Sequence, residues 1–141
     1  MAVVLLDSSI YISALRSGDG ALTLKRLTAD MIVWLSAVVL EELHAGAGEH
    51  DHEVVEKLEG DFTQAGRILV PNLDDWIQVG KVLARLAVKY DYEQIGRSRL
   101  TNDALIAMSA ARLGIRIITT NARDFRKLSE FRAFSWQLAA L

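Results

Sequence analysis

Short apolar runs alternate along the chain with longer stretches that carry a helical pattern. The apolar runs predict strands over residues 3–6, 32–36, 68–70 and 115–119, with 134–136 as a candidate edge strand. Between them, apolar periodicity and capping residues predict helices over residues 8–16, 21–27, 37–45, 49–66, 73–90 and 103–113, and a short helix from Ala122. Residues 91–99 form a polar stretch that predicts a loop. The alternation predicts an α/β fold, in which one domain over residues 1–141 has a mainly parallel central sheet of four to five strands flanked by helices.

Composition narrows the class of protein. The 141 residues are 51% hydrophobic and 24% charged, which fits one globular domain with a sizeable core. There is no cysteine, so disulfides and thiolate zinc sites are excluded. The longest apolar runs are far too short to cross a bilayer, and the amino end reaches Asp7 without the basic region of a secretory signal. We therefore expect a cytoplasmic protein that does not bind a membrane.

The net charge of −2 conceals an asymmetry between the two halves of the chain. Residues 1–70 hold 5 basic and 11 acidic side chains, a net of −6, whereas residues 71–141 hold 11 basic and 7 acidic, a net of +4. A basic half is compatible with a polyanionic partner. Two solvated faces of opposite sign explain the same split, and charge alone favours that interpretation because the chain as a whole is not basic.

Polar side chains follow two of the predicted strands. Asp7 comes directly after the strand at 3–6, and Asn121 and Asp124 follow the strand at 115–119. In a parallel sheet the carboxyl ends of the strands meet at one edge, where ligands bind. We therefore expect Asp7 and either Asn121 or Asp124 at the same edge of the sheet.

A further acid, Asp103, opens a helix that is apolar almost all round, so this helix is expected to be central and buried. A simpler explanation exists for each aspartate, since an acid at the positive end of a helix is favourable without any function. However, Ser8 or Ser9 could cap the helix after Asp7, and Asn102 could cap the helix of Asp103, which leaves both aspartates surplus.

The adjacent glutamates Glu41 and Glu42 differ in helical phase, because successive residues of a helix are turned by about 100°. Val38, Val39 and Leu43 fall together on the apolar face of their helix. Glu42 borders this face, whereas Glu41 points nearly opposite to it. We expect Glu41 to be solvated. Glu42 is turned toward the core, where an unpaired carboxylate is costly, so it requires an Arg or Lys partner or a metal.

Taken together, the acids indicate a cation site. Like charges gathered in a cleft repel one another and raise each other's pKa values, and a divalent cation relieves that repulsion. Ligands that offer only oxygen suit Mg²⁺ or Mn²⁺. Carboxylates that hold such a metal beside a basic rim favour attack of metal-activated water on a phosphodiester. The expected metal ligands are Asp7, Glu42, Asp103 and Asp124.

Four segments carry these acids in order along the chain: LLDSSIYI, EELHAG, NDALIAMSAARLG and TTNARDF. They resemble the PIN domain family, specifically the VapC-like toxins of toxin–antitoxin pairs, over essentially the whole chain. The last two segments are the most specific part of the likeness. The resemblance implies a Mg²⁺- or Mn²⁺-dependent endoribonuclease that cleaves RNA, dimerises with a second copy and is held inactive by a small antitoxin.

The resemblance also implies roles for individual residues. Asp7, Glu42 and Asp103 match the family's catalytic, metal-binding acids. The family's fourth acid varies in position, and Asn121 stands at one place where it can lie. Either Asp124 supplies that charge or the site has three strong acids, which leaves open whether one or two metals bind. Thr120 and Asn121 are candidates for orienting water or phosphate.

Other candidates have weaker support. Arg97 and Arg99 precede Asp103 and could contact RNA phosphate, although exposed loop residues would look the same. His50-Asp51-His52 has metal-ligand spacing, but its polar surroundings favour a solvated surface. His44 falls on another side of its helix from Glu42 and should not join the same pocket. Trp34, Trp76 and Trp136 are more typical of core or dimer contacts than of base stacking.

Two other classes of function compete with the nuclease. A catalytically silent RNA-binding or interaction module could use the same fold. A phosphoacceptor signalling domain also gathers acids at strand ends, but it requires a second acid beside Asp7 and a lysine after the last central strand. This chain has Ser8-Ser9 and Thr119-Thr120-Asn121 at those places.

Overall fold

The computed structural model describes residues 1–91 and 97–139, and of residues 97–99 the backbone alone. Its five strands are β1 (Ala2–Leu6), β2 (Met31–Ser36), β3 (Ile68–Leu69), β4 (Arg116–Thr119) and β5 (Trp136–Leu138). They form one sheet in the order β3-β2-β1-β4-β5, and every pair is parallel. The predicted α/β fold with a parallel sheet is confirmed.

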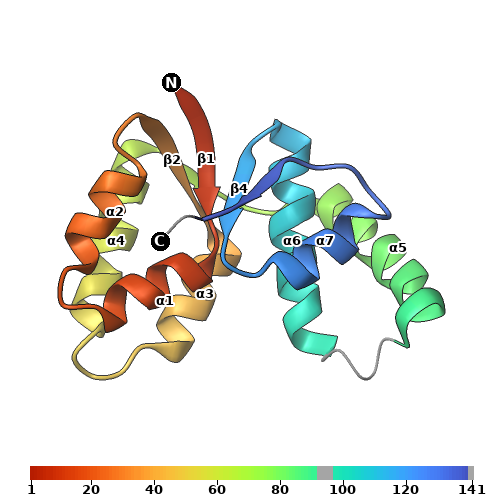
Figure 1. Ribbon diagram of the computed structural model, residues 1–141, viewed down its shortest axis with the longest axis horizontal. Coiled ribbons are helices and arrows are strands. Elements are labelled where there is room, and N and C mark those ends of the chain that lie inside the picture. Colours follow the sequence, from red (N-terminus) through yellow and green to blue (C-terminus); the bar gives the residue numbers. More distant parts are fainter. Residues whose placement is uncertain (92–96, 140–141) are drawn as a thin grey trace.

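Within the described residues, seven helices connect and flank the strands (Figure 1). Four lie toward one side of the molecule: α1 (Ser8–Arg16), α2 (Gly20–Leu27), α3 (Ala37–Gly46) and α4 (His52–Ala65). Three lie toward the other side: α5 (Leu73–Tyr90), α6 (Arg97–Leu113) and α7 (Ala122–Ser129). Among the described residues, no helix is both long and apolar enough to span a bilayer.

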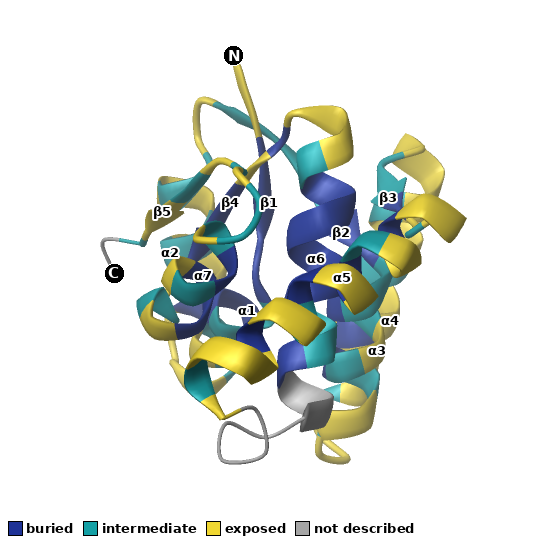
Figure 2. Ribbon diagram, turned by 90° about the vertical axis from the view of Figure 1, so that its right-hand side faces the viewer, coloured by how far each residue is buried: buried dark blue, intermediate teal, exposed yellow. Residues whose placement is uncertain are grey.

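The central strands and α6 form the buried core. Leu5 in β1 and Ile117 in β4 are fully buried. Leu5 pairs in register with Trp34 of β2, and Ile117 pairs with Trp136 of β5. In α6 every residue from 103 to 110 is buried, as the apolar sequence of this helix predicts (Figure 2). Burial of this uninterrupted apolar stretch contributes a large part of the hydrophobic stabilisation of the fold.

Three predicted elements begin at the wrong residue, and the first is α4, which starts at His52 rather than at 49. α6 begins at Arg97, not at 103, so residues 97–99 of the predicted loop over 91–99 are helical, while residues 92–96 of it lie outside the described residues. The reason is tertiary: Leu100 is fully buried and continues the apolar face of α6 one turn back from Ala104. The edge strand β5 begins at Trp136, two residues later than expected. Phe134 packs edge-to-face on Phe125, with ring centroids 6.2 Å apart, and the ladder with β4 starts after it.

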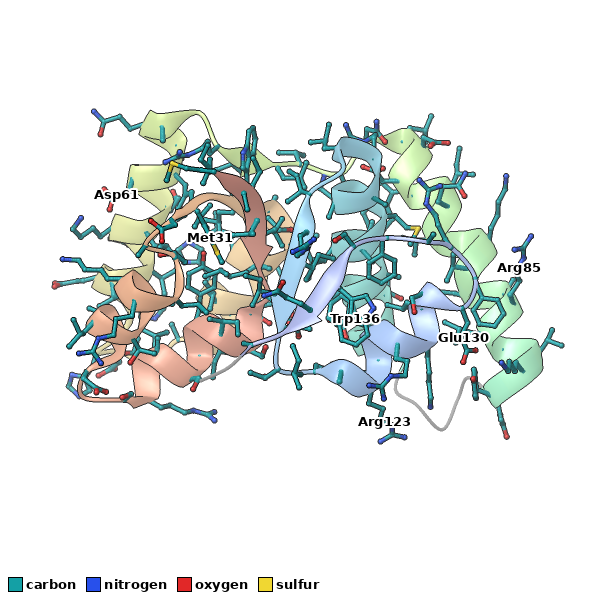
Figure 3. The ribbon with its side chains drawn as sticks, turned by 45° about the horizontal axis from the view of Figure 1, so that its top comes forward. Met31, Asp61, Arg85, Arg123, Glu130 and Trp136 are labelled. Carbon is teal, nitrogen blue, oxygen red and sulfur yellow. The ribbon has the colours of Figure 1, made fainter. Side chains whose placement is uncertain are left out.

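The acidic and basic halves of the sequence lie on opposite sides of the folded molecule. The acidic helix α4 lies on the side formed by the first half of the chain, while α5 and α7 carry basic residues on the opposite side (Figure 3). Asp61 marks the acidic side in that view, and Arg85 and Arg123 mark the basic side. The carboxyl ends of β1 and β4 lie between the two sides (Figure 1).

One buried ion pair joins α5 to α6. Asp75 is 1% exposed and accepts three hydrogen bonds from the Arg112 guanidinium, at 3.0 to 3.1 Å. Asp75 also completes a capping box with Asn72 at the start of α5. Arg112 donates further to the carbonyl of Val70 at 3.4 Å. This ion pair fixes the first turn of α5 against the last turn of α6.

Replacing Arg112 by alanine should therefore destabilise the fold by about 3 kcal/mol, because the buried Asp75 carboxylate loses its cation. Lys57→Ala is the matched control, since its ion pair with Asp61 is exposed, and it should cost less than about 0.5 kcal/mol. Urea unfolding followed by circular dichroism measures both. Equal losses in the two variants would contradict the assignment.

Candidate metal centre

Asp7 ends β1 and begins α1. Its backbone N–H donates to the Ile118 carbonyl at 2.9 Å, which continues the pairing of β1 with β4. Its side chain is 3% exposed and accepts from the Ser8 N–H at 2.8 Å, the Ser9 hydroxyl at 3.0 Å and the Thr119 hydroxyl at 2.8 Å. Asp7 is therefore itself the cap of α1. The expectation that a serine caps this helix is wrong, because both serines donate to the aspartate instead.

The turn after β4 is bonded to the turn after β1. The Thr119 hydroxyl, which donates to Asp7, also accepts from the Asn121 N–H at 2.9 Å. The Thr120 N–H donates to the Ser9 hydroxyl at 3.2 Å. The carboxyl ends of the two central strands thus share one hydrogen-bond network, as the parallel sheet predicts.

Asn121 stands between two buried aspartates. Its amide nitrogen is 3.0 Å from Asp124 Oδ2 and 3.4 Å from Asp103 Oδ2, and its Oδ1 accepts from the Asp124 N–H at 3.4 Å. Asp103 and Asp124 are 5% and 7% exposed. The amide of Asn121 therefore donates to both carboxylates and also caps α7.

Glu42 differs from Glu41 as the helical phase predicts: Glu41 is exposed, and Glu42 is half-buried beside the network. Ser8 and Asn102 lie beside the Glu42 carboxylate, whose buried Oε1 has no hydrogen-bond partner among the described residues. Burial raises the pKa of Glu42, and so do the charges of Asp7 and Glu41, while the polar side chains of Ser8 and Asn102 lower it.

The four predicted acids therefore lie at one edge of the sheet, joined through shared hydroxyl and amide donors. Within residues 1–91 and 97–139, no ion pair to Asp7, Glu42 or Asp124 is present. Across the same residues, no three His, Asp or Glu side chains stand close enough together to hold one metal ion. The donor set nevertheless fits Mg²⁺ or Mn²⁺ in kind: it is all oxygen, and Glu42 Oε1 is buried without a partner.

The remaining candidates divide clearly. Thr120 is exposed and contributes its backbone N–H rather than its side chain, whereas Asn121 is central. Arg97 and Arg99 lie in the first turn of α6, and their side chains fall outside the described residues. His44 pairs with Glu59 at 2.8 Å, away from Glu42, as predicted.

The His50-Asp51-His52 segment is solvated, because both histidines are exposed. Sequence reasoning missed the roles of Thr119, whose hydroxyl donates to Asp7, and of Asn102, which lies beside Glu42 and lowers its pKa. The sequence offers a hint for each of them, since Thr119 directly precedes the candidate Thr120 and Asn102 directly precedes the candidate Asp103. Only the fold shows which carboxylate each one reaches.

Comparison with known families assigns the chain to one of them. Residues 4–130 match the family model of the PIN domain. The chain belongs to the PIN domain family. The Asp7, Glu42, Asp103 and Asp124 positions all fall inside the matched range of this PIN domain. No curated protein matches the chain.

Solved structures share the fold of this PIN domain over its whole length. DNA-bound VapBC from Salmonella typhimurium matches at 20% identity and a TM-score of 0.66, covering 98% of each chain. VapBC2 from Rickettsia felis, bound to a promoter DNA fragment, matches at 20% identity and a TM-score of 0.64, covering 98% of this chain and 99% of that one. VapBC-5 from Mycobacterium tuberculosis, described as a member of a toxin–antitoxin family, matches at 24% identity and a TM-score of 0.58 over 100% of both chains.

The raised pKa of Glu42 makes a prediction about the metal-free PIN domain. An acid whose pKa is raised by folding contributes stability below its unfolded value, about 4.5, and that stability is lost as the pH rises through the folded value. At about pH 7.5 Glu42→Gln should therefore be more stable than the natural chain, and at about pH 4 the two should be equal. Urea unfolding in EDTA at both pH values measures this.

The matched control is Glu41→Gln, which should follow the natural chain at both pH values because Glu41 is exposed. A stability gain in Glu42→Gln that stays the same across this pH range would contradict the assignment, because it would come from packing rather than from charge.

Proposed function

We propose that this PIN domain is a Mg²⁺- or Mn²⁺-dependent endoribonuclease and the toxin of a toxin–antitoxin pair. The observation that carries the proposal is the set of acids at the carboxyl ends of β1 and β4, with the partnerless Glu42 Oε1 beside Asp7 in the described part of the chain. Asp7 is buried and Glu42 is half-buried beside it, so the two carboxylates repel each other, and a cation between them would remove that cost.

Asp7, Glu42 and Asp103 would hold the cation, with Asp124 as a weaker or water-mediated contributor. A bound divalent cation lowers the pKa of a water and offsets negative charge on a phosphoryl oxygen. The chain's own contribution is orientation: Ser9 and Thr119 hold the Asp7 carboxylate through their hydroxyls, and Ser8 and Asn102 lie beside the Glu42 carboxylate. Fixed donors of this kind need no rearrangement at the moment of reaction.

RNA as the substrate is supported by the charge of α7. Arg123 and Arg126 are exposed on the helix that carries Asp124, so basic side chains lie near the acids without pairing with Asp7, Glu42 or Asp124 in the described part of the chain. Such residues bind a phosphate backbone irrespective of its sequence. The absence of a Ser–His or Cys–His pair in the motifs favours direct attack by water.

A cognate antitoxin is proposed because the structural neighbours from Salmonella typhimurium and Rickettsia felis are VapBC complexes. A cavity of about 380 Å³ lies between α1, α2, α3 and α4, and its lining is mainly apolar, including Leu24, Val55 and Leu58. The buried hydroxyl of Tyr11, which also lines it, has no hydrogen-bond partner among the described residues. This cavity could bind apolar side chains of such a partner.

We also propose that the protein acts as a homodimer in the cytoplasm.

The alternative is a catalytically silent RNA-binding module. Two observations favour it: the Asn121 amide already joins Asp103 and Asp124, and the described acids do not converge as a ready metal cluster. Titration with Mn²⁺ by calorimetry separates the two functions. Binding that is lost in both Asp7→Asn and Asp103→Asn supports the nuclease, and no binding in the natural chain supports the silent module.

The adjacent glutamates should differ in cleavage of RNA. Glu42→Gln should lower the rate by about 100-fold or more, because it removes a charged ligand beside the partnerless oxygen. Glu41→Gln should stay within about twofold of the natural chain, because its side chain is exposed on the same helix. A fluorescent RNA cleavage assay with saturating Mg²⁺ measures both. Loss of activity in the Glu41 variant alone would show that Glu41, not Glu42, is the ligand.

The products should carry 5′-phosphate and 3′-hydroxyl ends. Attack by water on the phosphorus gives these ends, whereas attack by the 2′-hydroxyl of RNA gives a 2′,3′-cyclic phosphate. End-group analysis of cleaved RNA with and without EDTA decides between them. Cyclic-phosphate products that persist in EDTA would overturn the mechanism even if every acid proved essential.

A further inference from the structure

Asn121 is a neutral side chain among the acids at the ends of β1 and β4. It caps α7, because its Oδ1 accepts from the Asp124 N–H at 3.4 Å. Its amide nitrogen lies 3.0 Å from Asp124 Oδ2 and 3.4 Å from Asp103 Oδ2. A primary amide carries two N–H donors, so this one side chain supplies a hydrogen bond to each carboxylate. A single neutral group therefore joins the acid of α6 to the acid of α7, two helices that lie side by side (Figure 1).

The orientation of the Asn121 amide is set by its neighbours. If the amide were turned over, its oxygen would face two carboxylates and its NH₂ group would face the N–H of Asp124, which leaves every one of these contacts unfavourable. The backbone of Asn121 is held as well, since its N–H donates to the Thr119 hydroxyl at 2.9 Å and that hydroxyl donates to Asp7. Position 121 thus requires a short side chain that accepts at one atom and donates at another. Asparagine meets this requirement, whereas an ionised aspartate only accepts.

Capping of α7 alone does not require an amide. Aspartate is as good a cap as asparagine, and its negative charge is favourable at the start of a helix. The buried surroundings disfavour it here, because Asp103 and Asp124 are 5% and 7% exposed. A third carboxylate between them would add like charge where water screens it poorly. The two neighbouring carboxylates, rather than the helix, therefore explain why a neutral donor stands at this position.

The acids are partnered differently at the two ends of the site. Beside Asp7, the buried Oε1 of Glu42 has no hydrogen-bond partner in the described part of the chain. Between Asp103 and Asp124, the two donors of Asn121 already offset part of the negative charge. A cation that bound between Asp103 and Asp124 would have to displace the amide, whereas a cation beside Glu42 would meet an oxygen that is still without a partner.

We propose that Asn121 is a positioning residue whose amide takes the place of a second cation between Asp103 and Asp124. The site then holds one divalent cation, on the side of Asp7 and Glu42. Asp124 contributes weakly to that cation because its Oδ2 is bonded to the amide. The number of cations rests on the proposed metal-dependent function, but the role of the amide in the metal-free protein does not.

Two substitutions separate a positioning amide from a simple helix cap in the metal-free protein. Asn121→Asp keeps a capping oxygen but replaces the donor with a carboxylate, whereas Asn121→Ala removes both. A positioning role predicts that Asn121→Asp is the less stable variant, with a folding equilibrium constant about tenfold below that of Asn121→Ala, because it adds a buried like charge. A capping role predicts the reverse order. Urea unfolding at neutral pH in EDTA measures the order.

The matched control is Thr120→Asp, which adds the same charge at the exposed neighbouring position. Its folding equilibrium constant should stay within about threefold of that of the natural chain, because water screens the added carboxylate. An equal loss of stability in Thr120→Asp and Asn121→Asp would show a general effect of added charge and would contradict the role of the amide.

Calorimetric titration with Mn²⁺ tests the number of cations. The natural chain and Thr120→Asp should each bind one Mn²⁺ per chain. Asn121→Asp should bind two, because three carboxylates then surround the place that the amide occupied. Saturating Mn²⁺ should also raise the urea midpoint of Asn121→Asp more than that of the natural chain. If Asn121→Asp is unfolded in EDTA, circular dichroism should show that Mn²⁺ refolds it.

The outcomes distinguish this inference from the proposed function. Two Mn²⁺ per natural chain would overturn the inference and leave the nuclease proposal intact, and so would a single Mn²⁺ in Asn121→Asp. No Mn²⁺ in the natural chain would overturn both. Asn121→Asp that is as stable in EDTA as the natural chain, with Asn121→Ala below it, would reduce Asn121 to a helix cap whatever the number of cations.

Discussion

A carboxylate that is buried at the end of a central strand must be satisfied by hydrogen bonds or by a cation, and this requirement shapes the site. Asp7 meets it with three hydrogen bonds from three neighbours, two in α1 and one at the end of β4. Those bonds hold the turn after β1 against the turn after β4, and they set the positions of Thr119 and Asn121. The other acids, Glu42, Asp103 and Asp124, lie around these two hydrogen-bonded turns.

The buried and half-buried acids differ in the partners that surround them. Asp75, at the start of α5, receives a full Arg112 guanidinium and serves to join two helices. Asp7 receives neutral donors, and Glu42 keeps one buried oxygen without any donor in the described structure. A purely structural acid is expected to be paired as Asp75 is. The incomplete satisfaction of Glu42 is therefore the observation that supports the proposed cation site.

Much of this fold follows from local patterns in the sequence. The phase of α3 separates Glu41 from Glu42 because apolar residues repeat with the helical period, and the five strands follow from short apolar runs. The start of α6 could not be predicted, because Leu100 belongs to the helix through its burial against the core rather than through any capping signal. The cap of α1 was missed for a similar reason: Asp7 and the two serines are all good caps, and the Thr119 hydroxyl from 112 residues away helps to fix Asp7 in that place.

The proposed function places two opposing demands on charge at this site. Acids would be needed to hold a cation, yet they would repel a polyanionic substrate at distances within about 10 Å at moderate salt. The fold separates the two demands in space rather than balancing them at one point. Asp7, Asp103 and Asp124 are buried between the two sides of the molecule, whereas Arg123 and Arg126 are exposed on α7. A phosphate backbone would meet the basic surface first, and only a phosphate that reaches the ends of β1 and β4 would meet the carboxylates. The acidic surface of α4 lies on the far side, where it favours a single direction of approach.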